Sequence, residues 1–249
     1  MRSQRRWCAI VLCTVLFFVT VSITVRPSLG AEKAVLAEEG RARLPVVISP
    51  KADQTVRAAA HNLAGYLGRI TGGEFKVHEG DATGGLVMGV PENFEDLPIE
   101  TDFGEGPFAR DAYRLVTRGE ELYLIGSTSK AVQFAVWDLL HRFGYRMYFP
   151  SEGWEVVPHK KNLAIEVDTY ERPSYYSRSA PRGGMRHKLR PWIHEGWKRW
   201  RIRNRTQSSF DLHTGHAYGG IIRRNKEEFE RHPERIFINV LFPAPFSPK

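Results

Sequence analysis

The sequence predicts an α/β protein: a two-layer sandwich of a mixed sheet with two helices on one face, followed by an incomplete (β/α) barrel start. Three observations indicate this fold. Short runs rich in valine and isoleucine alternate with two segments of helical periodicity between residues 40 and 174. Beyond Ser174 the pattern changes to strand, helix, strand, helix. A complete barrel needs about 250 residues, and 75 follow Ser174, so no closed barrel is expected.

The first part of the predicted domain is a strand followed by a helix. Residues 44–48 are apolar and end before Pro50, as a buried strand does. The helix that follows should end at Gly72, because glycine commonly terminates helices. Its apolar residues recur at steps of three and four: Val56, Ala60, Leu63, Leu67 and Ile70.

Four strands and a loop should come next. Residues 74–78 and 86–90 have strand character, and 91–109 form a loop rich in proline, glycine and acidic residues. Residues 112–117 and 121–125 are two apolar runs separated by a glycine-containing turn. This spacing predicts a β-hairpin.

A second helix and two strands complete the predicted domain. Residues 128–143 are apolar on much of the helical circumference, and Gly144 provides the stop. Residues 145–149 resume strand character. Apolar and acidic residues alternate over 163–167, which predicts a half-buried strand before Pro173.

The remaining chain should begin a barrel and then lose all periodicity. Strand-like residues 175–180 precede a helix over 192–202. A second strand over 207–212 precedes a helix over 218–231. The expected division is therefore a leader (1–30), an accessory domain (40–174), a truncated barrel start (175–235) and an irregular tail (236–249).

Residues 1–30 have the features of an export signal. Arginines near the N-terminus precede an apolar run over 7–25, and small residues such as Gly30 follow it. Cleavage should give a mature chain that begins near Ala31, in the periplasm or outside the cell. The run also approaches the ~20 residues that span a bilayer, so an uncleaved anchor is the alternative. A membrane is expected as a partner only in that second case.

Positive charge is concentrated in one stretch. The chain carries 36 basic and 28 acidic residues, and 178–205 alone holds 10 basic residues and one acidic residue. Trp192, Trp197 and Trp200 are interleaved with these charges. One interpretation is a solvated helix face whose arginines pair with acids elsewhere in the fold. The other is a site for a carboxylate-bearing polysaccharide, since arginine binds carboxylates through two donors and aromatic rings stack on sugars.

Thiol chemistry and bound cofactors are not expected. Both cysteines, Cys8 and Cys13, lie in the leader, so the mature chain has no disulfide framework, thiolate metal site or cysteine nucleophile. No metal or other cofactor is expected. Nucleic acid is also not expected as a partner, because an exported protein seldom meets it.

Several segments, in a fixed order, resemble a known domain. They are 59–72, 108–115 (FARDAYRL), 124–131 (LIGSTSKA) and 135–150 (AVWDLLHRFGYRMYFP). The series resembles the non-catalytic α/β domain that precedes the barrel in β-N-acetylhexosaminidases and α-glucuronidases, within large exported hydrolase-like proteins. The resemblance covers about 44–175. Residues 200–205 and 213–234 further resemble the beginning of the barrel in those proteins, and the likeness ends near Glu234.

The resemblance places the catalytic acids of these enzymes on later barrel strands. Glycoside hydrolysis usually needs two carboxyl groups that flank the scissile bond, and hexosaminidases carry them as an adjacent Asp-Glu pair. No Asp-Glu dipeptide occurs in this sequence. Catalytic residues are therefore unknown, and whether the chain is an enzyme stays open: its relatives are glycoside hydrolase-like, but the carboxylates are missing.

Four residues are candidates for contact with a sugar. Arg178 and Arg182 belong to one predicted strand end, and His213 and His216 to the next. Barrel strands present these ends on the ligand-binding face, and the side chains suit an anionic or hydroxyl-rich sugar. For the two histidines, metal ligation and a structural or solvated role are the alternatives. The absence of a cysteine or carboxylate at ligand spacing makes a zinc site a weak interpretation.

These observations predict the N-terminal fragment of an exported carbohydrate-active protein. The carbohydrate-active protein would act on a polysaccharide or oligosaccharide, with uronic-acid chains among the candidates. The chain given by this sequence would itself be inactive. The alternative is a stand-alone carbohydrate- or polyanion-binding module.

Overall fold

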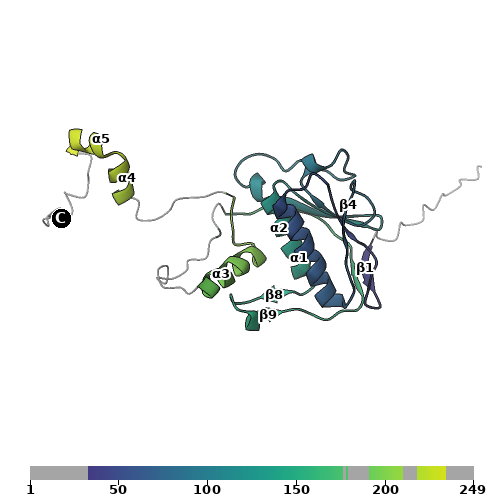
Figure 1. Ribbon diagram of the computed structural model, residues 1–249. Coiled ribbons are helices and arrows are strands. Elements are labelled where there is room, and N and C mark those ends of the chain that lie inside the picture. The colour runs from purple at the N-terminus through teal and green to yellow at the C-terminus, as the bar shows by residue number, and fades with distance from the viewer. Residues whose placement is uncertain (1–32, 176–177, 179–190, 210–217, 234–249) are drawn as a thin grey trace, which may run out of the picture. The chain divides into compact units, whose positions relative to one another are not determined.

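The computed structural model describes residues 33–175, 178, 191–209 and 218–233 (Figure 1). The predicted leader, the predicted tail and most of the strand predicted over 175–180 lie outside these ranges. Within the described residues, no helix is long and apolar enough to cross a membrane. The described strands form three separate sheets and close no barrel, as the prediction of an incomplete barrel start requires.

The main sheet is mixed and has six strands in the order β11-β6-β7-β5-β3-β4. Its strands are β3 (Val46–Ile48), β4 (Val77–Glu79), β5 (Leu86–Gly89), β6 (Tyr113–Arg118), β7 (Glu121–Gly126) and β11 (Asp168–Glu171). Strands β4, β3, β5 and β7 run parallel, whereas β6 is antiparallel to both β7 and β11. The predicted hairpin is confirmed: Arg118 pairs with Glu121, and Gly119 takes the positive φ of 59° that this tight turn requires.

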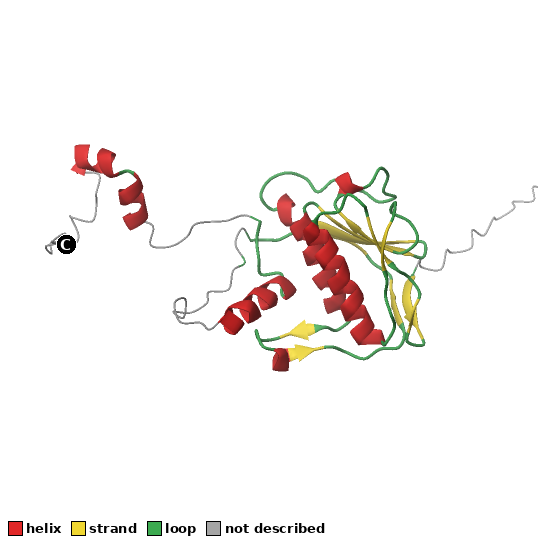
Figure 2. Cartoon of the chain, viewed as in Figure 1, coloured by secondary structure: helices red, strands yellow, loops and turns green. Residues whose placement is uncertain are grey.

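Helices α1 (Gln54–Thr71) and α2 (Ser129–Arg142) lie side by side on one face of the main sheet (Figure 2). Their buried residues pack against every second residue of the central strands, because side chains alternate between the two faces. The strand residues on this face are Val46, Ile48, Leu86, Met88, Tyr113, Leu115, Leu122 and Leu124. The predicted two-layer arrangement, with both helices on one face, is confirmed.

Both helices begin at capping side chains. The Asp53 carboxylate accepts a hydrogen bond from the backbone amide of Val56 at 2.8 Å, and the Thr128 hydroxyl caps α2 in the same way. Asp53 also accepts a hydrogen bond from the Ser129 hydroxyl at 2.6 Å, which ties the two helix beginnings together. Gly72 ends α1 in the left-handed conformation, with φ of 85°.

Residues 91–111 cover the opposite face of the main sheet. This segment is the predicted loop, and it contains two short 3-10 helices, η1 (Pro91–Asn93) and η2 (Ala109–Asp111). Ile99 and Phe103 are buried against strand residues of the second face. Arg114 pairs with Glu100 at 2.8 Å and so fastens the segment to β6. The strand residues beneath it are Val47, Val87, Val116, Tyr123 and Ile125.

A second, smaller sheet was not predicted. It consists of β1 (Ala34–Glu38), β2 (Arg41–Ala42) and β10 (Leu163–Ile165) in the order β10-β1-β2. The prediction of one continuous strand over 163–167 is therefore wrong. The chain leaves the small sheet after β10 and enters the main sheet as β11, where the backbone amide of Val167 donates to the Thr117 hydroxyl at 3.2 Å.

The segment after α2 forms a small hairpin instead of a main-sheet strand. It consists of β8 (Arg146–Met147), the 3-10 helix η3 (Glu152–Trp154) and β9 (Glu155–Val156). Helix α3 (Pro191–Arg203) confirms the helix predicted over 192–202 and packs beside α2. The Asn204 amide donates to the backbone oxygen of Met147 at 3.0 Å, so the end of α3 is joined to β8.

The last predicted helix is divided in two. Helices α4 (Tyr218–Arg224) and α5 (Lys226–Arg231) are separated at Asn225, whose φ of −118° and ψ of 34° are not helical. The Asn225 amide donates to the backbone oxygen of Ile221 at 2.9 Å, which is the competing local bond that disfavours asparagine inside helices. The described residues 207–209 of the preceding predicted strand are irregular.

Candidate functional site

Three buried carboxylates of the α/β domain form ion pairs with arginines that follow the domain in the sequence. Asp111 ends η2, Asp138 lies in α2 and Glu155 begins β9. Their side chains are 2%, 9% and 10% exposed. We call the three carboxylates and their partners the arginine junction: Asp111, Asp138 and Glu155 with Arg178, Arg205 and Arg203, respectively.

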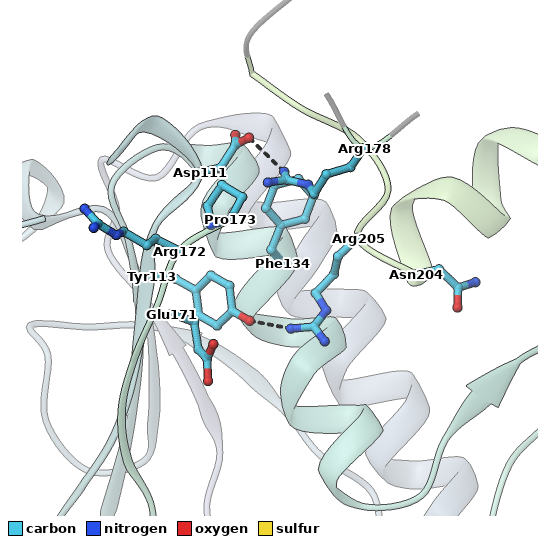
Figure 3. Close-up of a pocket in the computed structure, with 9 residues that line it drawn as sticks. All are labelled: Asp111, Tyr113, Phe134, Glu171, Arg172, Pro173, Arg178, Asn204 and Arg205. Atoms are coloured by element: carbon cyan, nitrogen blue, oxygen red, sulfur yellow. Dashed lines mark hydrogen bonds and ion pairs between the residues drawn. The ribbon is translucent and has the colours of Figure 1, made fainter. Parts of the chain in front are cut away.

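Asp111 accepts three hydrogen bonds from two donor groups of this later segment. The Arg178 Nη2 atom lies 2.8 Å from Oδ2 of Asp111 (Figure 3). The backbone amide of Ser209 donates to both carboxylate oxygens, at 3.0 and 3.1 Å. Arg178 in turn donates through Nε to the backbone oxygen of Gln207 at 3.1 Å, and its guanidinium lies 5.2 Å from the centre of the Phe134 ring. Arg178 thus has both a carboxylate partner and an aromatic ring within cation–π distance.

Asp138 forms ion pairs with two arginines from different parts of the chain. Arg142, one turn later in α2, donates through Nε to Oδ2 at 3.0 Å, and Arg205 pairs with Oδ1 at 2.8 Å. Arg205 also donates to the hydroxyl oxygen of Tyr113 at 2.5 Å (Figure 3). Burial raises the pKa of Tyr113 well above its ordinary value, although Arg205 acts in the opposite direction. Tyr113 is therefore a neutral hydrogen-bonding group at physiological pH.

Glu155 accepts four hydrogen bonds. The hydroxyls of Tyr66 and Tyr145 donate to Oε1 at 2.6 and 2.8 Å, Arg203 donates to the same oxygen at 2.6 Å, and Arg69 donates to Oε2 at 3.0 Å. Burial alone would raise the pKa of Glu155, but these donors outweigh it and hold the pKa below its ordinary value. The carboxylate thus joins α1, the region of β8 and α3.

His141 lies beside the junction as a neutral ring. It stacks on Tyr145, with ring centres 6.0 Å apart and planes 11° apart. Its Nε2 atom is buried and has no hydrogen-bond partner within the described residues. Burial, together with the charges of Arg205 and Arg146, lowers the pKa of His141 to about 4.

A cavity of about 240 Å³ opens beside Asp111 and Asp138's partner Arg205 (Figure 3). Both arginines on its inner wall, Arg178 and Arg205, are already paired, and the Arg172 side chain extends away from them. Its two carboxylates, Asp111 and Glu171, each pair with an arginine. Neither carboxylate that lines this cavity is therefore free of an ion pair.

The predicted site residues are only partly within the described part of the chain. Arg178 is described and belongs to the arginine junction. Arg182, His213 and His216 lie outside the described residues, so their meeting at one ligand stays a prediction. No cluster of three metal-ligating side chains occurs among the residues that the structure describes.

The sequence analysis missed the three carboxylates, although a signal was present. Residues 31–177 hold 16 basic and 22 acidic residues, whereas 178–205 hold 10 and one. Opposite charges in consecutive segments are consistent with pairing between them. The first interpretation of the basic stretch, that its arginines pair with acids elsewhere, describes Arg178, Arg203 and Arg205 correctly.

No protein-family model matches the chain, and no curated protein is similar to it. Similar solved structures include a family GH115 4-O-methyl-α-glucuronidase with specificity for decorated arabinogalactans, at 17% identity and a TM-score of 0.48, over 70% of this chain and 25% of that one. They also include a family GH20 β-N-acetylhexosaminidase from Streptomyces coelicolor A3(2), at 19% identity and a TM-score of 0.40, over 61% and 26% of the two chains. The chain thus spans about a quarter of the length of each enzyme. These are the two enzyme classes that the ordered sequence segments resemble.

Proposed function

We propose that this chain is the N-terminal part of an exported, carbohydrate-active, glycoside hydrolase-like protein. In it, the α/β domain is a non-catalytic anchor for the polypeptide that follows. The arginine junction carries the proposal, because three carboxylates of the domain, with side chains at most 10% exposed, pair with arginines between residues 178 and 205. Such a junction would hold the beginning of a barrel in a fixed position on the accessory domain.

Energetics favour an anchoring role for these carboxylates over a catalytic one. Removing one partner of a buried ion pair typically costs about 3–5 kcal/mol, because the other charge stays buried without compensation. Glu155 already accepts hydrogen bonds from four donors and has a lowered pKa. A general acid in a glycosidase needs the opposite, a raised pKa and room for the substrate.

Export and the polysaccharide substrate are supported by the sequence. The charged and apolar residues of 1–30 have the order of an export signal. The ordered segments between 59 and 150 resemble the domain that precedes the barrel in two classes of glycosidase. We include a polysaccharide or oligosaccharide with uronic acids in the proposal because residues 178–205 hold 10 basic residues and one acidic residue, and arginine binds carboxylates through two donors.

The anchoring role is tested by amide hydrogen exchange across α3. Glu155→Gln keeps the size of the side chain but removes the charge that pairs with Arg203, so exchange in α3 should increase at least tenfold. Glu152→Gln, a change at an exposed residue three positions away, is the matched control and should leave exchange unchanged. Equal protection of α3 in the two variants would contradict the proposal.

The expected lack of hydrolytic activity is tested separately. The chain should not hydrolyse aryl glycosides of N-acetylhexosamine or glucuronic acid above the buffer rate. Turnover that a carboxylate substitution abolishes would show that a functional acid pair exists in this chain.

One observation favours the second candidate, a binding module. Phe149 and Trp154 are exposed aromatic residues, and both lie on the hairpin that contacts α3.

A further inference from the structure

Three aromatic side chains form a surface at the edge of the arginine junction. Phe149 and Trp154 are 58% and 57% exposed, and their ring centres are 5.9 Å apart. Trp197 of α3 lies 6.5 Å from Phe149, with the two ring planes at 51°. We call Phe149, Trp154 and Trp197 the aromatic surface. Each ring costs free energy while it is in contact with water, so such a group marks a site of interaction.

The backbone beneath the aromatic surface is held in place. The amide of Tyr148 donates to the oxygen of Trp154 at 3.0 Å, and the amide of Trp154 donates to the oxygen of Ser151 at 3.0 Å. Gly196 of α3 lies so close to Pro150 that a Cβ atom would come within 2.4 Å of the proline oxygen. The rings are therefore presented by a fixed scaffold, which reduces the entropy lost on binding.

Polar side chains without partners lie on the same two elements as these rings. A pocket of about 480 Å³ is lined by Glu152 of η3 and Arg199 of α3, together with the Glu155 cluster. Both side chains are exposed, and neither has a hydrogen bond or ion pair with another described residue. Arg199 can offer several donors and Glu152 several acceptors. None of the three rings lines this pocket, but Trp154 belongs to η3 with Glu152, and Trp197 belongs to α3 with Arg199.

We propose that the aromatic surface and this pocket bind a polysaccharide chain. A pyranose ring presents C–H bonds on its faces and hydroxyls at its edge. The C–H bonds match the electron-rich faces of aromatic rings, and the hydroxyls match the free donors and acceptors of Arg199 and Glu152. The inference deepens the proposed function, and only its choice of a carbohydrate ligand rests on that function.

The size of the surface favours a sugar over a protein partner. An aromatic side chain buries about 150–250 Å² when it is fully covered. Two rings that are more than half exposed and a third that is less exposed offer at most roughly 300 Å². A stable protein interface needs about 800 Å² from each partner. Exposed charged residues are close to the rings in sequence, at Glu152, Lys198 and Arg199. The area suits two or three sugar rings.

Titration of the full chain with xylohexaose, cellohexaose and chitohexaose tests the proposal. Tryptophan fluorescence and calorimetry should show saturable binding of at least one oligosaccharide, with little effect of salt because the ligands are neutral. Trp154→Ala should weaken binding at least tenfold, and Trp154→Phe should restore part of it by keeping a ring. Tyr175→Ala, which removes an exposed aromatic residue outside this surface, is the matched control and should bind as the unmodified chain does.

Three results would overturn the proposal. The first is no saturable binding of any of the three oligosaccharides. The second is binding that Trp154→Ala leaves unchanged. The third is a concentration-dependent dimer, seen by sedimentation, that Trp154→Ala abolishes, because the surface would then be a protein interface. Melting temperatures show that each variant is folded. Hydrogen exchange of α3 in Glu155→Gln reports on the anchor independently, so failure of one proposal leaves the other testable.

Discussion

Arg203 of α3 and Glu155 of β9 form an ion pair 2.6 Å long, and both side chains are largely buried. The Arg203 guanidinium also lies 5.3 Å from the ring centres of both Tyr66 and Trp137. One arginine thus joins α3 to a carboxylate and to aromatic rings of α1 and α2. Its planar shape permits both interactions at once, which the ammonium group of lysine does not.

Arg203→Met should destabilise the protein by about 2–3 kcal/mol. The value is below the ~3–5 kcal/mol typical of a broken buried pair, because Arg69 still compensates Glu155. Arg43→Met is the control: its partner Glu38 and Arg43 itself are both 55% exposed, and exposed pairs contribute about 0–1 kcal/mol. Urea denaturation of the two variants gives the comparison. Equal losses of stability in the two variants would show that the Arg203–Glu155 pair contributes no more to stability than an exposed ion pair.

Two helical glycines should respond oppositely to substitution by alanine. A Cβ atom at Gly65 in α1 would meet nothing within 4 Å, so Gly65→Ala should stabilise the protein by up to about 1 kcal/mol. At Gly196 in α3 it would come within 2.4 Å of the Pro150 oxygen. Gly196→Ala should therefore lower the melting temperature and loosen α3. Stabilisation by both substitutions would mean that α3 does not pack against Pro150.

The sequence predicts the layers of the fold better than its junctions. Helices α1 and α2 have long apolar stripes and clear caps at Asp53 and Thr128, and such local signals are readable without tertiary information. The small sheet is different, because β1 and β10 pair across more than a hundred residues. The two residues of β2 are too short for any periodicity.

The candidate site was less predictable because its pairs are distant in sequence. Glu155 meets Arg203, Asp138 meets Arg205 and Asp111 meets Arg178 only after folding. Each carboxylate on its own lies in no local sequence pattern that identifies its partner. The uneven distribution of charge between 31–177 and 178–205 was the one signal that indicated pairing, and it does not identify individual partners.

His141 should make the stability of the protein depend on pH. Its pKa is about 4 in the folded chain and about 6.5 when the chain is unfolded. The unfolded state therefore binds more protons between these values, and the free energy of unfolding should fall as the pH decreases from about 6.5 to 4. Arg205 and Arg146 oppose protonation, and Asp138 favours it.

The contribution of His141 is measured by comparing the protein with His141→Leu. Carboxylates such as Glu155, with a lowered pKa, also destabilise the protein in acid, but they do so in both chains. The difference in unfolding free energy between the two should change between pH 6.5 and 5 and be constant above pH 7. If the unfolding free energies of the two proteins differ by the same amount at every pH, the pKa of His141 is not lowered in the folded chain.

A domain expressed as residues 33–175 should fold on its own, because both helices and all six strands of the main sheet are retained. It lacks Arg178 and Ser209, which supply every side-chain hydrogen bond of Asp111 given by the described structure. In the full chain, Asp111→Asn should cost about 1–3 kcal/mol, since it leaves buried donors without a charged acceptor. In the isolated domain Asp111 is no longer covered by these groups, so the same substitution should have almost no effect.

The difference between the two costs is the coupling between the domain and the following segment. Thermal and urea unfolding of the four proteins measures it, and a cost that is the same in both lengths would contradict the anchoring role of Asp111.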